Sequence, residues 1–198
     1  LVSSNSDLIP PSVSPDWITH VYKDVASPVA SNDTTYNPDA GFPRKMTAAD
    51  GRLGVWVDPG IAAARTHVLN MLQDMVENYN VDGVILDQAR YPGDAFPKRS
   101  MSFGYNPTAL SEMSAGATPA PGNSTFVFKR RDVITNFVRT ANSSIRAIKP
   151  WVIVGAGLFT DGTTTYYTDT GAFQYVIGWA IAPNAGHVGG LGVVDFVA

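Results

Sequence analysis

The stretch Val81-Asp82-Gly83-Val84-Ile85-Leu86-Asp87-Gln88-Ala89-Arg90-Tyr91-Pro92 decides the fold that this sequence predicts. A turn pair, Asp82-Gly83, is followed by three apolar residues, and such a short unbroken run is typical of a strand buried on both faces of a parallel sheet. The run ends at Asp87, and the carboxyl end of a parallel strand is where α/β barrels place their chemistry. Two interpretations of Asp87 stay open: a catalytic carboxylate, or a structural one that bonds to loop amides or pairs with Arg90.

The composition is that of a globular chain. Its 198 residues are 44% hydrophobic and 16% charged, enough for one substantial core. The net charge of −3 gives no basic stripe, so nucleic acid is not an expected partner. No apolar run reaches about eighteen residues, so no membrane span is predicted. Cysteine is absent, and the three histidines show no ligand spacing, so neither a metal nor another cofactor is expected: His20, His67 and His187.

Segments on either side of this stretch alternate between strand and helix patterns. Residues 54–57 predict a strand, and residues 61–79 predict a helix with one apolar stripe. Between them, Asp58 is expected to be the N-cap and Pro59 the first helical residue, and capping is favoured over catalysis for Asp58.

A second helix is predicted over residues 128–149. Its Lys and Arg residues are expected to form a solvated face, and Pro150 to end it. Apolar runs at 151–159 and 191–198 predict two more parallel strands. Since the chain ends within the last of these runs, and three or four strands do not close an eight-stranded barrel, we expect a piece of a larger domain.

The connection over residues 92–125 is rich in Gly, Pro, Ser and Ala. A loop of this length in a compact domain is usually functional or disordered, and we expect it over the carboxyl ends of the strands. Its aromatic residues suit stacking on the apolar faces of sugar rings; alternatively they pin the loop to the body of the domain, and both possibilities stay open. They are Phe96, Phe103 and Tyr105.

Several of these segments resemble the glycosyl-hydrolase-like family ten of barrel proteins, in the right order over nearly the whole chain. The resemblance implies an incomplete (β/α)₈ TIM barrel, roughly the fourth to sixth strands plus the loop after the third, with residues 1–198 a fragment of one such domain. The matching segments are Pro15-Asp16-Trp17, Val57-Asp58-Pro59-Gly60, Arg65, residues 79–87, Arg90-Tyr91-Pro92, residues 103–107, Arg130-Arg131-Asp132-Val133, Ile148-Lys149-Pro150 and Val194-Asp195-Phe196-Val197.

The family name implies glycoside hydrolysis, which needs two carboxylic groups. Asp87 is the first choice for one. Asp161, at the carboxyl end of the next strand, is the comparable acid, although Asp161-Gly162 is also a common turn and the structural role is favoured there. Arg90 is expected to orient Asp87 or to bind a substrate hydroxyl. Stacking candidates are Tyr91, Tyr105 and Trp179, the last of which is equally compatible with a buried core position.

Two functions of different classes remain. One is a glycosidase acting on a cell-surface or extracellular polysaccharide, located outside the cell or in its envelope, with the remaining barrel strands as structural partners. The other is a carbohydrate-binding or envelope-structural protein on a degenerate barrel. Many relatives carry a second acid after the one matching Asp87. Gln88 at that position favours the second function, whereas Asp87 with Arg90 favours the first.

Overall fold

The computed structural model describes residues 2–3, 15–22, 43–47, 55–87, 89–92, 103–120, 123–156 and 196–197. Three helices longer than one turn lie within these ranges: α1 (Ala62–Asn78), α2 (Pro107–Ser114) and α3 (Ser124–Ile148). The shorter elements are β1 (Val2–Ser3), the 3-10 helix η2 (Pro15–Trp17), β2 (His20–Val21), β3 (Arg44–Lys45), β4 (Val55–Trp56), β5 (Gly83–Leu86), β6 (Ile153–Ala156) and β7 (Phe196–Val197). No helix among the described residues has the length and apolar character needed to cross a membrane.

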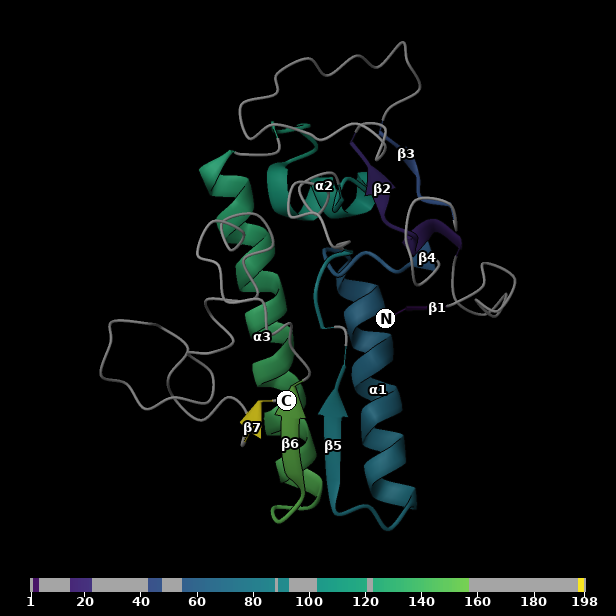
Figure 1. Ribbon diagram of the computed structural model, residues 1–198, viewed down its shortest axis with the longest axis vertical. Helices are drawn as coiled ribbons and strands as arrows, with labels where there is room; N and C mark the ends of the chain where they lie inside the picture. The colour runs from purple at the N-terminus through teal and green to yellow at the C-terminus, as the bar shows by residue number, and fades with distance from the viewer. Residues whose placement is uncertain are drawn as a thin grey trace.

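The parallel strands predicted from the apolar runs are confirmed for β5, β6 and β7, which form one sheet in that order (Figure 1). The strand β5 pairs with β6 from Gly83 opposite Ile153 to Leu86 opposite Ala156, and β6 pairs in parallel with β7. The chain crosses from β5 to β6 through α2 and α3, so the helix α3 returns it to the same end of the sheet.

The strand β4 lies outside this sheet, which differs from the run of parallel strands that the sequence predicts. It pairs in antiparallel fashion with β1. Segment 15–22 forms further backbone hydrogen bonds with residues 56–58: Thr19 N donates to Trp56 O at 2.9 Å, and Asp58 N donates to Trp17 O at 2.7 Å. These contacts satisfy the backbone of β4 without a partner from β5.

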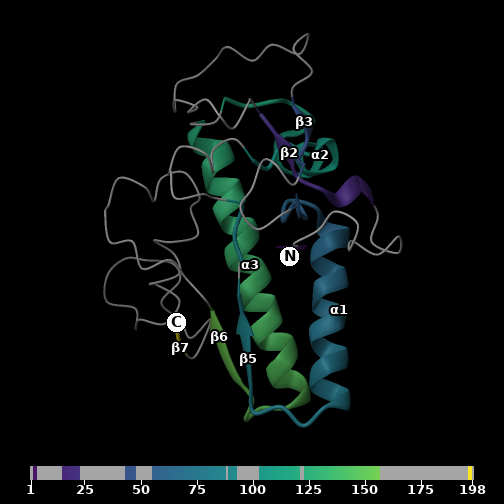
Figure 2. The same ribbon diagram turned by 45° about the vertical axis from the view of Figure 1, so that its right-hand side comes forward.

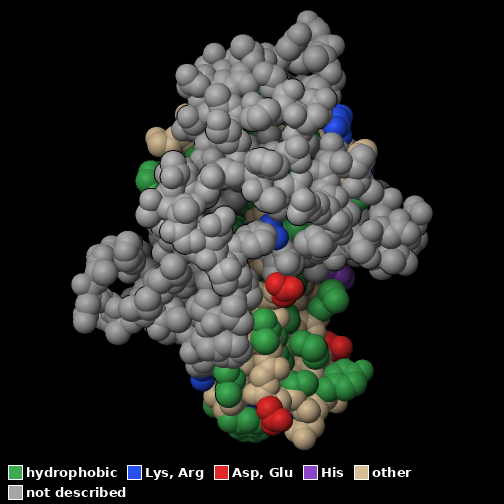
Figure 3. Space-filling view, viewed as in Figure 1, with side chains coloured by type: hydrophobic (Ala, Val, Ile, Leu, Met, Phe, Trp, Pro, Cys, Tyr) green, Lys and Arg blue, Asp and Glu red, His purple; other side chains and the backbone are tan. Residues whose placement is uncertain are grey.

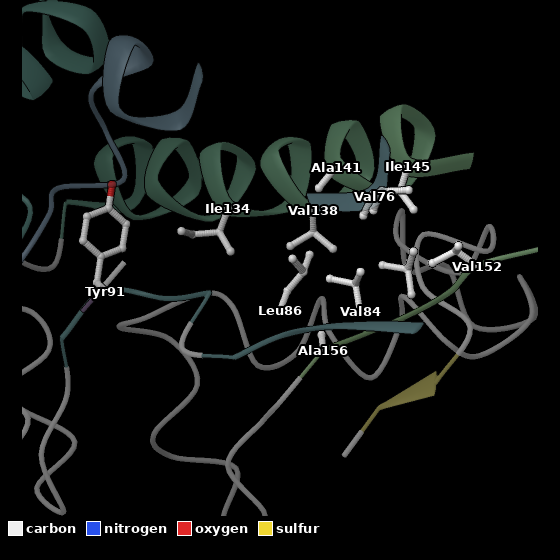
Figure 4. Close-up of a cluster of buried hydrophobic side chains, with 11 residues drawn as sticks. Val76, Val84, Leu86, Tyr91, Ile134, Val138, Ala141, Ile145, Val152 and Ala156 are labelled. Atoms are coloured by element: carbon white, nitrogen blue, oxygen red, sulfur yellow. The ribbon is translucent and has the colours of Figure 1, made fainter. Parts of the chain in front are cut away.

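Helices α1 and α3 cover one face of the parallel sheet (Figure 2). Figure 4 shows Ile134, Val138 and Ile145 of α3 facing Val84 and Leu86 of β5 across the core. These apolar contacts come from residues four and seven apart on α3, the spacing that puts side chains on one helical face.

The other face of the sheet carries exposed apolar side chains, so the prediction that β5 is buried on both faces is wrong for the structure described. Val84 and Leu86 are buried, whereas Ile85 is 56% exposed. Ile153 of β6 is 49% exposed and lies on the same face, because its partner in the ladder is Gly83. In the space-filling view, hydrophobic side chains gather where Figure 1 places β5, β6 and α1 (Figure 3).

The connection between β5 and α3 contains a helix, which the sequence interpretation missed. Asn106 caps α2, since its side-chain Oδ1 accepts from Thr108 N at 2.8 Å, and Pro107 begins the helix. At the other end Ala115 and Gly116 have positive φ angles of 52° and 80°. Figure 1 places α2 beyond the carboxyl end of β5, as expected for this connection.

Two arginines of α3 are buried, which corrects the prediction that all its basic residues form a solvated face. Arg130 is fully buried, and Arg131 is 9% exposed. The rings that cover them come from the helix itself and from the segment after β5: the Arg130 guanidinium lies over Phe126 and Tyr91, and that of Arg131 over Phe128. Cation–π contact with aromatic rings makes these burials tolerable.

Candidate functional site

A pocket of about 420 Å³ lies at the carboxyl ends of β4 and β5. Helices α1 and α3 form its apolar wall, and charged side chains from the two strand ends and from α1 complete it. Its lining residues are Val57, Asp58, Pro59, Ala64, Arg65, Val68, Leu72, Ile85, Leu86, Asp87, Ala89, Arg90, Ile134 and Phe137. The carboxyl edge of a parallel sheet is the usual location of ligand sites in α/β proteins.

Asp87 follows β5 directly and contributes an exposed carboxylate to this pocket. Its backbone N donates to Ile85 O at 3.1 Å, a tight turn that ends the strand. Because the strand before it is held by the β6 ladder and by core contacts of Val84 and Leu86, the backbone that carries Asp87 is firmly placed. Asp87 therefore faces solvent at the pocket and not the hydrophobic core.

Arg90 lines the same pocket. Its guanidinium lies over the Trp56 ring with Cζ 4.9 Å from the ring centroid, and its Nη1 donates to Tyr91 O at 3.3 Å. Trp56 belongs to β4, so this cation–π contact connects the end of β4 to the turn after β5. A guanidinium held in this way presents hydrogen-bond donors near Asp87 at the pocket wall.

Arg65, on the first turns of α1, also lines the pocket. Its Nη1 donates to Pro59 O at 2.6 Å, and its Nη2 lies 3.8 Å from Oε2 of Glu112 in α2. Sequence reasoning noted Arg65 only as part of the family resemblance. Arg65 lies three residues after the start of a helix that follows a strand end, and this position was the sequence signal that it would line the pocket.

Tyr91 and Tyr105 are fully buried, so the expectation that they stack on sugar rings is wrong for this structure. The Tyr91 ring lies over Arg130, and its hydroxyl is 3.8 Å from the sulfur of Met113. The Tyr105 ring packs against Tyr22 with centroids 4.8 Å apart. Burial raises the pKa of both phenols above its ordinary value. Of the two possibilities left open for the connection, Tyr105 and the equally buried Phe103 show the second, since both rings pin it to the body of the domain. Phe96 lies outside the described residues.

Two further predicted site residues, Asp161 and Trp179, lie outside the described residues. Within those residues no group of three or more His, Cys, Asp or Glu side chains is arranged to hold a metal ion.

Asp58 does not cap α1, which corrects the sequence prediction. The helix begins at Ala62, and its N-cap residue Ile61 makes no side-chain cap bond. Glu112 of α2 supplies the acceptor instead, since Ala62 N donates to its two carboxylate oxygens at 3.0 and 3.2 Å. The cap comes from a residue 50 positions away, so local sequence gives no sign of it.

Asp58 is a fully buried carboxylate that joins three segments of the chain. Its Oδ1 accepts from Gly60 N at 2.8 Å, and its Oδ2 accepts from Thr19 Oγ1 at 2.9 Å and from Asn106 N at 3.4 Å. Burial raises the pKa of Asp58 from 3.8 to about 6, although these hydrogen bonds and the nearby charge of Arg130 oppose the rise.

The partners of Asp58 extend this polar cluster. Thr19 Oγ1 accepts from Gly104 N at 2.9 Å, and the Asn106 amide donates to Asp16 O at 2.6 Å and to Ile18 O at 2.8 Å. Asp58, Thr19 and Asn106, which we call the rim cluster, thus hold segments 15–22, 55–60 and 103–108 together beside the pocket. The sequence signal for such a site was Asp58-Pro59-Gly60, a turn in which the Asp side chain bonds two residues on.

Comparison with known proteins places these features in a family. Residues 35–175 match the model of the family described as Glycosyl hydrolase-like 10. Over 109 residues, 53% of this chain, the sequence is 28% identical to a protein of Bacillus subtilis (strain 168) described as "Glycosyl hydrolase YngK". The matched segment spans 19% of the length of that relative.

Proposed function

This chain belongs to the Glycosyl hydrolase-like 10 family, and from that premise we propose that it hydrolyses glycosidic bonds of a polysaccharide or oligosaccharide. The observation that carries the proposal is Asp87, an exposed carboxylate that follows a parallel strand and lines a pocket with Arg90. A family description and a fold do not determine chemistry by themselves, so the proposal rests on this side chain and its surroundings.

In the proposed mechanism Asp87 is one of the two carboxylic groups that glycoside hydrolysis requires. It acts as the base that activates water or as the nucleophile, because an exposed carboxylate at the pocket is ready to accept a proton or to attack the sugar carbon. Asp161 is the proposed second acid, since it follows the next strand of the sheet in sequence. Asp58 is not assigned this role, because it is fully buried and both its oxygens accept hydrogen bonds from the protein.

Arg90 and Arg65 are proposed to bind hydroxyl groups of the sugar. Both guanidiniums line the pocket and are held by neighbouring groups: Arg90 by the Trp56 ring, Arg65 by Pro59 O. The apolar wall from α1 and α3 suits the C–H faces of a sugar ring. Trp179 is kept as a proposed stacking residue.

We further propose that the sheet belongs to a (β/α)₈ barrel, of which this chain supplies part. Support comes from the arrangement of its two faces: helices α1 and α3 cover one, while Ile85 and Ile153 are exposed on the other. In a barrel that second face is turned inward and packed in layers. The proposed substrate is a cell-surface or extracellular polysaccharide, with the protein outside the cell or in its envelope.

One observation favours a second function, a carbohydrate-binding protein without catalysis. Two acids among the described residues line the pocket, and of these Asp58 is fully buried while Asp87 is exposed. One accessible acid suffices for hydrogen bonds to a sugar, whereas hydrolysis needs a pair of carboxylic groups. Gln88, at the position where the family resemblance implies a second acid, agrees with this alternative.

The test is Asp87→Asn in the full-length protein, assayed for hydrolysis on a panel of polysaccharides. Loss of a catalytic base should lower kcat by about two orders of magnitude or more, while the melting temperature stays close to that of the wild type because Asp87 is exposed. The matched control is Asp82→Asn, a second exposed aspartate at the amino end of β5, which should keep full activity.

Two outcomes contradict the proposal. If Asp87→Asn retains activity, Asp87 is structural. If neither the wild type nor the variants hydrolyse any member of the panel, but the wild type binds one of them, the result supports the non-catalytic, carbohydrate-binding function.

A further inference from the structure

Arg130 is a buried charge that the proposed chemistry does not use. It lies in the second turn of α3 and is fully buried. Its Nη1 donates to Phe103 O at 2.8 Å, and its Cζ lies 5.0 Å from the centroid of the Tyr91 ring and 5.3 Å from that of Phe126. Burying a guanidinium costs several kcal/mol of folding free energy unless its surroundings compensate, so an apolar residue at this position would destabilise the fold less.

The contacts of Arg130 join two parts of the chain between β5 and α3, one at Tyr91 and the other at Phe103. Phe103 begins the described part of the connection, and Tyr91 follows β5. Gly104 lets the two meet: its φ is +93°, and a Cβ there would lie 2.9 Å from Tyr91 Cε1 and 3.2 Å from Arg130 Cδ. The backbone of 103–104 therefore lies against the Tyr91 ring and the Arg130 side chain.

Tyr91 transmits this placement to the pocket. Arg90 is its neighbour in the chain, donates from Nη1 to Tyr91 O at 3.3 Å, and lies over Trp56. Arg130 and Met113 hold the Tyr91 ring, and the ring in turn holds the backbone at residues 90 and 91. The Arg90 side chain extends from this fixed backbone to the Trp56 ring.

We propose that Arg130 is a positioning residue for the pocket: through the Tyr91 ring it keeps the Arg90 guanidinium on Trp56 beside Asp87. Arg130 itself is buried and does not touch a substrate. This inference deepens the proposed hydrolase function and rests on it for its effect on turnover. Its structural content, the location of Arg90, is independent of whether the pocket is catalytic.

Turnover is tested by a double-mutant cycle on the full-length protein. Arg130→Met removes the charge and keeps an unbranched side chain of similar reach. We expect it to lower kcat/KM about tenfold or more when Arg90 is present, and by less than about twofold in the Arg90→Ala background, because the two residues act through one arrangement. Equal losses in both backgrounds overturn the inference, since a general loss of stability would affect both alike.

The matched control is Arg131→Met. Arg131 is the next residue of α3 and is also buried, but its guanidinium lies over Phe128, 5.2 Å from the ring centroid, and not over Tyr91. It should lower stability and leave kcat/KM of the folded protein within about twofold of the wild type. A loss of kcat/KM as large as that of Arg130→Met would mean that any buried arginine of α3 has the same effect, which overturns the inference.

Crystal structures separate this inference from the proposed function. In Arg130→Met the Arg90 guanidinium should leave the Trp56 ring; if it stays there in the folded variant, the inference is wrong whether or not the protein is a hydrolase. Should Arg130→Met fail to fold, Arg130→Lys is the second variant, because lysine keeps the charge but lacks the planar group that stacks between Tyr91 and Phe126. A wild type inactive on every substrate would overturn the proposed function, and the Arg90 position would still decide the inference.

Discussion

The Asp58 carboxylate gives the folded protein a pH dependence that one substitution should remove. Burial raises its pKa from 3.8 to about 6, so the folded protein binds the proton more tightly than the unfolded chain. The stability that Asp58 contributes is therefore fully present below pH 3.8 and is lost as the pH rises through about 6. A pKa difference of this size corresponds to about 3 kcal/mol.

Asp58→Asn is the perturbation, because the amide has the size of the neutral acid and does not titrate. Urea unfolding of the wild type and the variant, both as full-length protein, gives the free energy of unfolding at intervals from pH 4 to pH 8. The difference between the two proteins isolates Asp58, since groups such as His20, whose pKa burial lowers, titrate in both. We expect the free energy of unfolding of the wild type, relative to that of the variant, to fall by about 2.5 kcal/mol across this range, mostly below pH 7, because about 0.5 kcal/mol of the total is already lost at pH 4.

A difference that stays flat within about 0.5 kcal/mol, or that grows as the pH rises, would refute this reasoning. Growth with pH would mean that the donors Thr19, Gly60 and Asn106, together with Arg130, outweigh desolvation and hold the pKa of Asp58 below its ordinary value. In that case the rim cluster would be strongest at neutral pH and would weaken in acid.

Two further predictions concern stability. Gly104→Ala should destabilise the protein by about 2 kcal/mol or more, because the new Cβ would sit at a strained φ of +93° and also meet Tyr91 Cε1 at 2.9 Å. Gly116→Ala is the control: its φ is +80° but nothing lies within 4 Å, so it should cost only about 1 kcal/mol. Equal losses of unfolding free energy in denaturant would contradict the packing argument. Glu112→Ala should cost about 1 kcal/mol through the lost cap of α1, with little from the partly exposed pair with Arg65, whereas Glu112→Gln, which keeps an acceptor for Ala62 N, should cost less.

The features that sequence predicted well are those set by local pattern. The apolar run of β5 and its turn pair predicted a parallel strand ending at Asp87, and the apolar stripe of α3 predicted that Ile134, Ala141 and Ile145 pack on the sheet. Helix α2 was equally predictable, since Asn106-Pro107 is a cap followed by a favoured first residue. It was missed because the small and polar residues around it suggested a loop.

Other features depend on partners distant in sequence, which a pattern along the chain does not reveal. Asp58 before Pro59 looks like an N-cap, yet the acceptor for Ala62 is Glu112 of another helix. Tyr91 in a loop beside a carboxylate looks like a stacking residue, yet Arg130 and Met113 cover it. In each case a tertiary contact overrides the local preference, and residue spacing carries no information about it.

Asp58 and Arg130 are best understood as one arrangement. Each is a fully buried charge beside the pocket, and the positive charge of Arg130 opposes the desolvation that raises the Asp58 pKa. Asp58 fixes segments 15–22 and 103–108 to the end of β4, while Arg130 fixes Phe103 and Tyr91 to α3. Apolar contacts tolerate sliding, but hydrogen bonds to particular backbone groups do not, because a displaced partner leaves a buried polar group unsatisfied. Asp58 thus defines the segments beside the pocket, and Arg130 acts through Tyr91 on the loop that carries Arg90; an apolar core at the same position would leave both less defined.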